Sequence, residues 1–396
     1  MKRILIVSHN LEIGGVERSL IGLLYALGNY NIIVDLFLFK HSGELLKYIP
    51  SNINLLPEIK QYTVLGRPMI DTLKEGHLLL TGARLFGKLR AAEYNKRNKL
   101  VHSDVAVEYS HKYTRWFMPE IASGQNYDLA VSFLTPHYFT AEKVRAKKKV
   151  AWIHTDYSMI RIDVDSELKM WSEYDIIIAI TDSVKNSFLK VFPSLEERIE
   201  IIQNILPKKI IEQEVTINTT VELPDRGIKL LSIGRFCYAK NFDSVPDICR
   251  IIADSGLDVY WFLIGYGPDE QLIKKRIKEK HMEDRVIILG KKDNPYPYIQ
   301  KCDLYVQPSR YEGNSVSVRE AQLLNKPVVV ADYPTAHSQL IDGVDGIIAS
   351  NKNYQFAKTL VDLLTNKDKV QKLVDECRRR DYSCLSESKK LIDLIP

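Results

Sequence analysis

The sequence predicts an α/β protein of two domains, each built around a parallel β-sheet. Its 396 residues exceed the roughly 150 that one domain usually holds. Short, continuously apolar segments alternate with helix-length segments, which is typical of parallel strands buried on both faces. A polar, weakly patterned stretch at 207–227 separates two such series. We therefore predict one domain at 1–205, a second at 206–375, and a helical tail at 376–396 that packs back toward the first domain.

The first series begins with the strand pattern MKRILIVS, a loop ending in Gly14-Gly15 and a helix through SLIGLLYAL. The strands predicted in this series are 1–8, 32–39, 128–134, 149–154, 175–180 and 199–204. The strands predicted in the second series are 228–234, 258–265, 285–290, 303–308, 327–332 and 346–349. Because ligands of parallel sheets sit beyond the carboxyl ends of the strands, we expect the site there, in a cleft between the two domains.

Composition narrows the setting of the protein. The 45% apolar and 27% charged residues are typical of a globular chain, and no apolar run approaches the ~20 residues that span a bilayer. The N-terminus turns polar too early for a signal peptide, so we expect a cytoplasmic protein. The five cysteines suggest neither a disulfide framework nor a zinc site; they are Cys237, Cys249, Cys302, Cys377 and Cys384.

The net charge of +5 comes from one segment, which we expect to be helical within residues 67–100. Between Lys74 and Lys99 seven basic residues stand against two acidic ones, interleaved with several leucines and Phe86. A basic amphipathic helix on an anionic membrane surface and a merely solvated helix both fit this pattern. We therefore expect either a freely cytoplasmic protein or one at the inner face of the plasma membrane.

Residues 309–332 carry the first candidate site. They run from a strand end through Glu312-Gly313-Asn314-Ser315 into a helix, whose free N–H groups and dipole form an anion site, with hydroxyls from Ser315 or Ser317. Glu312 and Glu320 are eight residues apart, roughly 12 Å along a helix. Because retaining glycosidases need carboxyls about 5–5.5 Å apart, these two do not form such a pair. Their separation suits a different role, in which each glutamate binds one end of an elongated ligand.

The segment Gly234-Arg235-Phe236-Cys237-Tyr238-Ala239-Lys240-Asn241 follows the first strand of the second domain. A guanidinium from Arg235 and an ammonium from Lys240 at one strand end suit a diphosphate, whose charges must be held and neutralised.

These ordered motifs resemble the retaining glycosyltransferases of family 4, whose hallmark is Glu, seven residues, Glu at this place in the second domain. The resemblance covers nearly the full length and implies a GT-B fold of two Rossmann-like domains facing across a cleft. It implies that Glu312 faces the donor sugar, that Glu320 binds the ribose hydroxyls, and that four residues act in catalysis: Glu312, His154, Arg235 and Lys240. It implies that the donor is bound by Gly15, Arg235, Lys240, Gly265, Gly290, Gly313, Asn314, Ser315, Val316 and Glu320.

The first domain contributes a glycine loop and a histidine. Gly14-Gly15 lacks a G-x-G-x-x-G fingerprint, and Asp35 lies inside its strand, which disfavours a dinucleotide-dependent dehydrogenase. The family places a histidine after the later strand, where His154 matches and His137 does not. Asp156 and His137 are weaker candidates for binding the acceptor.

Neither a metal nor a cofactor is expected. Asp163-Val164-Asp165 imitates a metal-binding Asp-x-Asp, but it precedes a helix instead of ending a strand. No His-Glu-x-x-His, Cys-x-x-Cys or Walker A pattern occurs in the sequence.

The resemblance implies a retaining glycosyltransferase that moves a hexose or N-acetylhexosamine from a nucleotide diphosphate sugar, UDP-linked by preference, to a glycan or lipid-linked glycan. Capsule, exopolysaccharide or other cell-surface polysaccharide synthesis is the expected setting, and no nucleic acid is expected as a partner. Asn314-Ser315 stands where Phe-Gly is usual, so sugar specificity stays open. The alternatives are a GT-B sugar-nucleotide epimerase or hydrolase, a phosphorylase, which would absorb visible light through pyridoxal phosphate, and a non-catalytic nucleotide-sugar binder.

Overall fold

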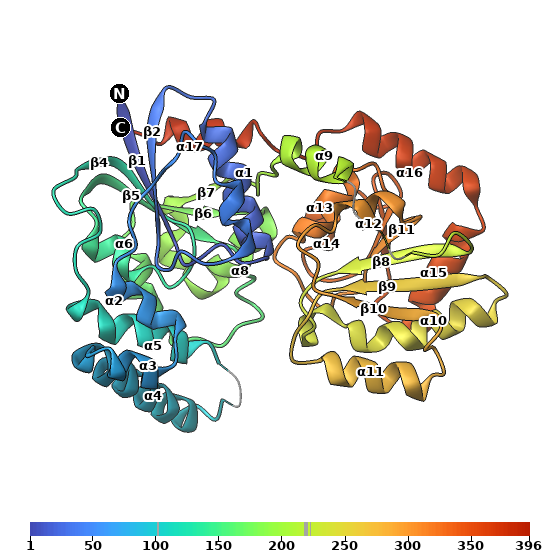
Figure 1. Cartoon of the computed structure of the whole chain (residues 1–396), viewed down its shortest axis with the longest axis horizontal. Helices are drawn as coiled ribbons and strands as arrows, with labels where there is room; N and C mark the ends of the chain where they lie inside the picture. The colour runs from blue at the N-terminus through green and yellow to red at the C-terminus, as the bar shows by residue number, and fades with distance from the viewer. Residues whose placement is uncertain (101–102, 218–220, 222) are drawn as a thin grey trace. The chain divides into compact units, whose positions relative to one another are not determined.

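The computed structural model divides into two compact units, each with its own parallel sheet and flanking helices (Figure 1). Unit 1 comprises Met1–Ile205 and Leu385–Pro396, and unit 2 comprises Leu206–Cys384. The residues that the structure describes are 1–100, 103–217, 221 and 223–396. The predicted fold class, an α/β protein with two parallel-sheet domains, is therefore confirmed.

Unit 1 contains seven parallel strands in the order β3-β2-β1-β4-β5-β6-β7. The strands are β1 (Lys2–Ser8), β2 (Ile32–Leu38), β3 (Asn54–Leu55), β4 (Tyr127–Ser132), β5 (Ala146–Ile153), β6 (Ile176–Ala179) and β7 (Ile199–Ile201). The α-helices are α1 (Gly15–Leu27), α2 (Lys60–Thr63), α3 (Met69–Lys74), α4 (Leu78–Arg97), α5 (Val105–Thr114), α6 (Tyr138–Lys143), α7 (Val164–Trp171), α8 (Asp182–Val191) and α17 (Glu387–Asp393). The 3₁₀ turns are η1 (Glu44–Tyr48), η2 (Val64–Gly66), η3 (Arg115–Phe117) and η4 (Pro193–Arg198). Residues 4–8 of β1 are buried, because helices cover both faces of the sheet.

Unit 2 contains six parallel strands in the order β10-β9-β8-β11-β12-β13. The strands are β8 (Ile228–Ile233), β9 (Val259–Ile264), β10 (Val286–Gly290), β11 (Leu304–Gln307), β12 (Val328–Ala331) and β13 (Ile347–Ala349). The α-helices are α9 (Lys208–Thr216), α10 (Val245–Asp254), α11 (Glu270–Glu279), α12 (Tyr296–Lys301), α13 (Val316–Leu323), α14 (Ala336–Gln339), α15 (Asn353–Leu364) and α16 (Lys367–Arg379), and the 3₁₀ turns are η5 (Tyr238–Lys240) and η6 (Phe242–Ser244). Strand order reverses at β8, which pairs with β9 on one side and β11 on the other. Such a reversal point opens a crevice at the carboxyl ends of the strands.

Two predictions about the segments between elements need correction. The stretch at 207–227, interpreted from its polar composition as a linker and the entry to the second domain, begins with α9, whose Ile210, Ile211 and Glu214 are buried. Its residues 218–220 and 222 lie outside the described part. The tail predicted at 376–396 is divided, since 376–384 group with unit 2 and 385–396 with unit 1.

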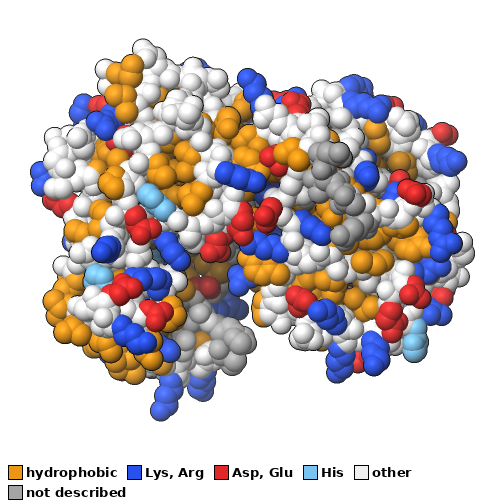
Figure 2. All heavy atoms as spheres, viewed as in Figure 1, with side chains coloured by type: hydrophobic (Ala, Val, Ile, Leu, Met, Phe, Trp, Pro, Cys, Tyr) orange, Lys and Arg blue, Asp and Glu red, His pale blue; other side chains and the backbone are white. Residues whose placement is uncertain are grey.

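Helix α4 packs on α5 through Gly87 and Ala91, while its buried Leu80 belongs to the core cluster around Tyr62. A Cβ on Gly87 would lie 2.8 Å from the carbonyl oxygen of Tyr109, so glycine permits the close approach of the two helices. Hydrophobic side chains and Lys and Arg side chains gather together over α3 and α4 (Figure 2).

Candidate active site

The candidate site of unit 2 is formed by two loops that leave neighbouring strands. Residues 234–241 follow β8 and residues 308–315 follow β11, and these strands pair side by side. Their carboxyl ends therefore meet at one edge of the sheet. This juxtaposition brings together the Arg235–Lys240 motif and the Glu312 turn that the sequence singled out.

The two loops are tied to each other by side-chain and backbone bonds. Asn241 adopts the left-handed conformation (φ 57°), and its amide Nδ2 donates to the carbonyl of Pro308 at 2.9 Å. The guanidinium of Arg310 forms two bonds to the carboxylate of Asp243, at 3.0 and 2.8 Å. These contacts fix the loop that carries Lys240 against the loop that carries Glu312.

Lys240 and Glu312 form an ion pair with 2.6 Å between Nζ and Oε1. Their side chains are 19% and 10% exposed, so the pair is largely shielded from solvent. The same Oε1 accepts a bond from the hydroxyl of Ser309 at 2.6 Å and one from the amide of Gln307 at 3.3 Å. Ser309 and Gln307 were not predicted from the sequence, although both lie at the strand end just before the predicted glutamate.

The ion pair leaves bonding capacity for a ligand. An ammonium has three N–H donors, and Glu312 takes one from Lys240. Within the described part of the chain, the second carboxylate oxygen of Glu312 makes no hydrogen bond. Arg235 is exposed at the end of β8, and its guanidinium makes no hydrogen bond or ion pair to any described residue. The strand end therefore presents a free guanidinium and a partly used ammonium, a donor set that suits phosphate oxygens.

The N-terminus of α13 lies after the same loop. Ser315 is its N-cap residue, and Gln339 holds it by accepting from its backbone N–H (3.1 Å) and donating to its carbonyl (2.6 Å). The buried side-chain oxygen of Asn314 has no hydrogen-bond partner among the described residues. Gly313 and Val316 complete this turn, and Val316 is buried. The free N–H groups and the dipole of the eight-residue helix add positive potential beside Lys240.

Glu320 occupies a more enclosed position than the predicted ribose contact requires. It is fully buried, and its Oε1 accepts a bond from the hydroxyl of Tyr296 at 2.9 Å. Tyr296 itself is 7% exposed. Because Glu320 is buried in this conformation, its contact with a ribose stays a prediction.

The predicted glycines of unit 2 join the ends of three strands. The N–H of Gly265 donates to the carbonyl of Gly290 at 3.0 Å, which ties the end of β9 to the end of β10. Gly265 has φ +151°, and a Cβ there would lie 1.9 Å from the carbonyl oxygen of Gly234 at the end of β8. Glycine is thus required where the backbones converge, whether or not a nucleotide base contacts them.

In unit 1 the predicted residues also follow strands. Gly15 is exposed at the start of α1, after the loop that leaves β1. His154 directly follows β5, and its ring stacks on Trp152 with an interplanar angle of 7°. Burial lowers the pKa of His154 to about 3, so its imidazole is neutral at physiological pH. A neutral ring can donate or accept a hydrogen bond, but it does not supply positive charge to a phosphate.

The two weaker acceptor candidates are buried, and each contacts a nearby serine. His137 is 1% exposed, and its Nδ1 lies 2.8 Å from the hydroxyl of Ser132. Asp156 is 3% exposed, and its Oδ1 accepts bonds from the backbone and hydroxyl of Ser158 at 2.9 and 2.7 Å. Both side chains are buried in this conformation, and their contacts with an acceptor stay predictions.

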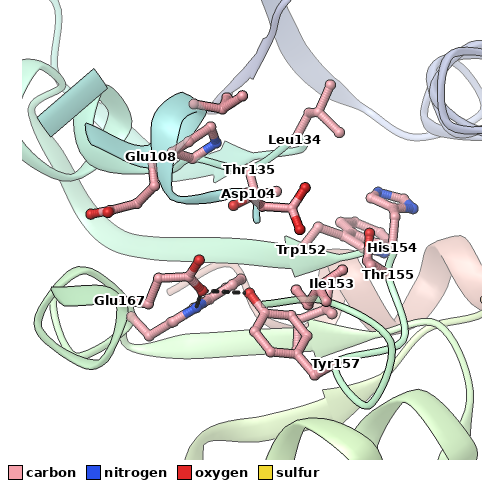
Figure 3. A pocket seen from close by; sticks show the side chains of 14 residues that line it. Asp104, Glu108, Leu134, Thr135, Trp152, Ile153, His154, Thr155, Tyr157 and Glu167 are labelled. Atoms are coloured by element: carbon pink, nitrogen blue, oxygen red, sulfur yellow. Dashed lines mark hydrogen bonds between the residues drawn. The ribbon is translucent and has the colours of Figure 1, made fainter. Parts of the chain in front are cut away.

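A pocket of about 160 Å³ lies beside His154 at the carboxyl ends of β4 and β5 (Figure 3). Its polar lining includes the carboxylates of Asp104, Glu108 and Glu167, none of which was predicted. They come from the start of α5 and from α7, whose sequences resemble ordinary surface helices. Only their position behind the strand ends distinguishes them.

Asp163 acts as a helix cap. Its Oδ1 accepts a bond from the backbone N–H of Ser166 at 3.2 Å at the start of α7, and its Oδ2 accepts from the hydroxyl of Tyr109 at 2.5 Å. In the described ranges, no group of three or more His, Cys, Asp or Glu side chains is arranged to hold a metal ion. Metal independence stays a prediction, because only an activity assay with and without a metal ion tests it.

Comparison with known proteins finds a family match in unit 2. Residues 216–380 match the family model of glycosyl transferases group 1. The chain is 25% identical to an uncharacterized glycosyltransferase of Methanocaldococcus jannaschii over 260 residues, which are 60% of this chain and 64% of the relative. It is 26% identical over 208 residues to the N-acetylgalactosamine-N,N'-diacetylbacillosaminyl-diphospho-undecaprenol 4-alpha-N-acetylgalactosaminyltransferase of Campylobacter jejuni, covering 51% of this chain and 54% of the relative. The chain thus spans less than two thirds of these curated relatives.

Solved structures extend the likeness to the whole chain. The crystal structure of Anabaena HepE in complex with UDP and glucose has a TM-score of 0.69 at 15% identity, with 99% of each chain covered. At this identity the likeness shows the fold alone. The fold of the two Rossmann-like units is that of the GT-B glycosyltransferases, as the sequence predicted.

Proposed function

We propose that this protein is a retaining glycosyltransferase that transfers a hexose or N-acetylhexosamine from a nucleotide diphosphate sugar, UDP-linked by preference, to a glycan or lipid-linked glycan. The observation that carries the proposal is the strand-end edge of unit 2, where the Lys240–Glu312 ion pair joins the loop that carries Arg235 to the loop that leads into α13. The UDP and glucose of the HepE complex and the diphospho-undecaprenol acceptor of the Campylobacter jejuni relative support this choice of donor and acceptor.

The chemistry follows from these charges. When the glycosidic bond of the donor breaks, negative charge develops on the leaving diphosphate. Arg235 and Lys240 would stabilise that charge, because donors fixed in advance need no reorganisation during the reaction. The leaving phosphate would take the proton of the acceptor hydroxyl on the same face of the sugar, which yields retention without a nucleophilic carboxylate. Glu312 would hold Lys240 in place and offer its second oxygen to a sugar hydroxyl.

The first experiment tests donor binding with a matched pair of variants. Lys240→Ala removes the ion pair with Glu312, and Lys274→Ala removes the exposed pair with Glu270 on α11, whose N–O distance is also 2.6 Å. Since a bond to a charged group contributes about 1.5–3 kcal/mol, Lys240→Ala should weaken UDP binding about tenfold to a hundredfold. Lys274→Ala should bind UDP like the unmodified protein.

The measurement is the rise of the melting temperature with UDP, GDP and their sugars, because a ligand that binds the native state stabilises it. Equal UDP shifts in both variants would remove the donor-site assignment. Incubating a radiolabelled donor with and without acceptor then separates transfer from the epimerase and hydrolase alternatives, which need no acceptor.

We further propose that helix α4 brings the protein to anionic membranes. Its exposed apolar face comprises Leu78, Leu79, Leu85, Phe86 and Leu89. At roughly 100° per residue the leucines of this face lie opposite the residues that pack on α5, with Lys88 and Arg90 along its two borders. Phe86, at one edge of the face, packs edge-on against Tyr113 of α5. Ile70 and Leu73 of α3 extend it, at 65% and 47% exposed. An apolar face bordered by cations matches the boundary between acyl chains and anionic headgroups. In the described part of the chain, no helix is both long and apolar enough to span a bilayer.

Vesicle binding tests this role. Leu79→Gln with Leu89→Gln should abolish sedimentation with vesicles of phosphatidylglycerol, and Leu272→Gln on α11, where leucine is 44% exposed, should not. Binding to phosphatidylcholine alone should be weaker at low salt, because Lys and Arg near an anionic surface contribute about 1 kcal/mol each. Equal sedimentation of both variants would leave α4 as a solvated helix.

A further inference from the structure

The pocket beside His154 carries polar atoms that the protein does not satisfy. Glu108 is 3% exposed, and its Oε1 accepts bonds from Ser166 (2.6 Å) and Tyr138, while its Oε2 is buried without a partner among the described residues. Trp152 is 2% exposed, and its indole N–H is likewise buried and unpaired. The large majority of buried side-chain polar atoms in proteins have a hydrogen-bond partner. His154 lines the same pocket, and both of its ring nitrogens are also buried without a hydrogen-bond partner in the described part of the chain. Unpaired polar atoms on three lining residues favour a polar ligand.

The shape of the pocket limits the size of that ligand. Its volume is about 160 Å³, and an engineered cavity of about 150 Å³ is known to hold one benzene ring. Trp152 and Trp171 supply flat apolar walls, while Asp104 lies on another side from the hydrogen-bonded Tyr157 and Glu167 (Figure 3). A single six-membered ring fits this space.

The charges of the pocket limit the chemistry. Its lining contains three carboxylates, from Asp104, Glu108 and Glu167, and neither Lys nor Arg. A phosphate, a diphosphate or a sugar acid would meet no positively charged side chain in this lining. A neutral sugar fits on every count, because its hydroxyls donate to carboxylates and accept from an indole N–H, and its C–H faces pack on aromatic rings.

We propose that this pocket binds one neutral sugar ring of the acceptor, with Glu108 and Trp152 as the groups that read its hydroxyls. This inference rests on the proposed transferase function, because it names the occupant as part of the acceptor. The pocket lies at the carboxyl ends of β4 and β5, where ligands of parallel sheets bind. Under this proposal, residues of α5 and α7 determine which acceptor sugar the protein selects.

The test titrates the full-length protein with methyl α-glucopyranoside, methyl α-galactopyranoside, N-acetylglucosamine and, as the anionic probe, glucuronic acid. Intrinsic fluorescence is the readout, since two of the four tryptophans, Trp152 and Trp171, line the pocket. We expect a saturable change with at least one neutral sugar and binding of glucuronic acid weaker by about tenfold or more.

Two pocket variants and one control decide the assignment. Trp152→Phe removes the N–H and keeps an aromatic ring, and Glu108→Gln replaces the unpaired oxygen or its neighbour by an amide. Each should weaken sugar binding about tenfold and raise the KM for acceptor without changing the UDP-induced melting shift. Trp116→Phe, at a residue 62% exposed, should change neither.

The outcomes separate this inference from the proposed function. If no neutral sugar gives a saturable change, or if both pocket variants bind sugar and acceptor normally, the pocket holds only water and the inference is overturned. If UDP binding and transfer fail while sugar binding persists and depends on Glu108 and Trp152, the donor assignment fails and the sugar pocket remains.

Discussion

The burial of Glu167 in the unit 1 pocket can be tested through the dependence of protein stability on pH. The side chain is 5% exposed, and burial raises the pKa of its carboxyl from 4.5 to about 7, although Tyr157 and Trp171 donate to its Oε2 at 2.8 and 3.3 Å. Below pH 4.5 the group is protonated in both the folded and the unfolded chain. Between 4.5 and 7 the unfolded chain releases the proton and the folded one keeps it, so rising pH favours unfolding.

Glu167→Gln removes this penalty, because the amide cannot ionise and its oxygen still accepts from Tyr157 and Trp171. At about 1.4 kcal/mol per pKa unit, the 2.5-unit shift corresponds to about 3 kcal/mol. At pH 4.5 the variant and the unmodified protein should have the same free energy of unfolding. The variant should become the more stable of the two as pH rises, by about 3 kcal/mol above pH 7.

Denaturant unfolding at pH 5, 6, 7 and 8 measures this difference through tryptophan fluorescence. Three of the four tryptophans lie in unit 1, so the signal reports mainly on the unit that carries Glu167. Glu197→Gln, at an exposed position of the same unit, should give a difference that does not change with pH. The burial argument is refuted if the stability difference for Glu167→Gln is likewise independent of pH, or if this variant is less stable than the unmodified protein at pH 8.

Three further substitutions test packing and binding. Gly87→Val should destabilise unit 1 by roughly 1–3 kcal/mol through overpacking against α5, whereas Gly82→Val, where a Cβ meets nothing within 4 Å, should cost less; equal melting temperatures would disprove the close helix contact. Gly265→Ala should lower the melting temperature of unit 2, since its Cβ would lie 1.9 Å from the carbonyl of Gly234; unchanged calorimetry would contradict the tight joining of strand ends. Glu320→Gln keeps a hydrogen-bond acceptor for Tyr296. If the carboxylate binds the ribose, this variant should bind UDP about tenfold more weakly, and an unchanged UDP affinity would exclude that role.

The strands could be predicted from sequence because burial on both faces leaves a local signature. All twelve apolar segments contain a strand, and only β3, which has two residues, gives too short a pattern to detect. Helix α9 was missed because its buried Ile210 and Ile211 stand among polar residues within a stretch that resembles a linker.

The sequence could not show which side chains from different strands contact each other. Arg235, Lys240 and Glu312 could be predicted at strand ends, but the ion pair of Lys240 with Glu312 joins residues 72 positions apart. Likewise, nothing in the local sequence of α5 or α7 distinguishes Glu108 or Glu167 from surface carboxylates. Strand order decides which loops meet, and it has no local pattern.

The two candidate binding regions differ in how their polar groups are satisfied. In unit 2, Glu312 already holds Lys240, Ser309 and Gln307, so its charge and orientation are set by the protein itself. In unit 1, buried polar atoms of Glu108 and Trp152 have no partner among the described residues. Leaving such groups unpaired costs about 1–3 kcal/mol each, which a fitting ligand would recover on binding. The side-chain oxygen of Asn314 in unit 2 is also unpaired among the described residues, but Glu312 there already has its partners. We therefore expect that a sugar which pairs Glu108 and Trp152 raises the melting temperature of unit 1 selectively.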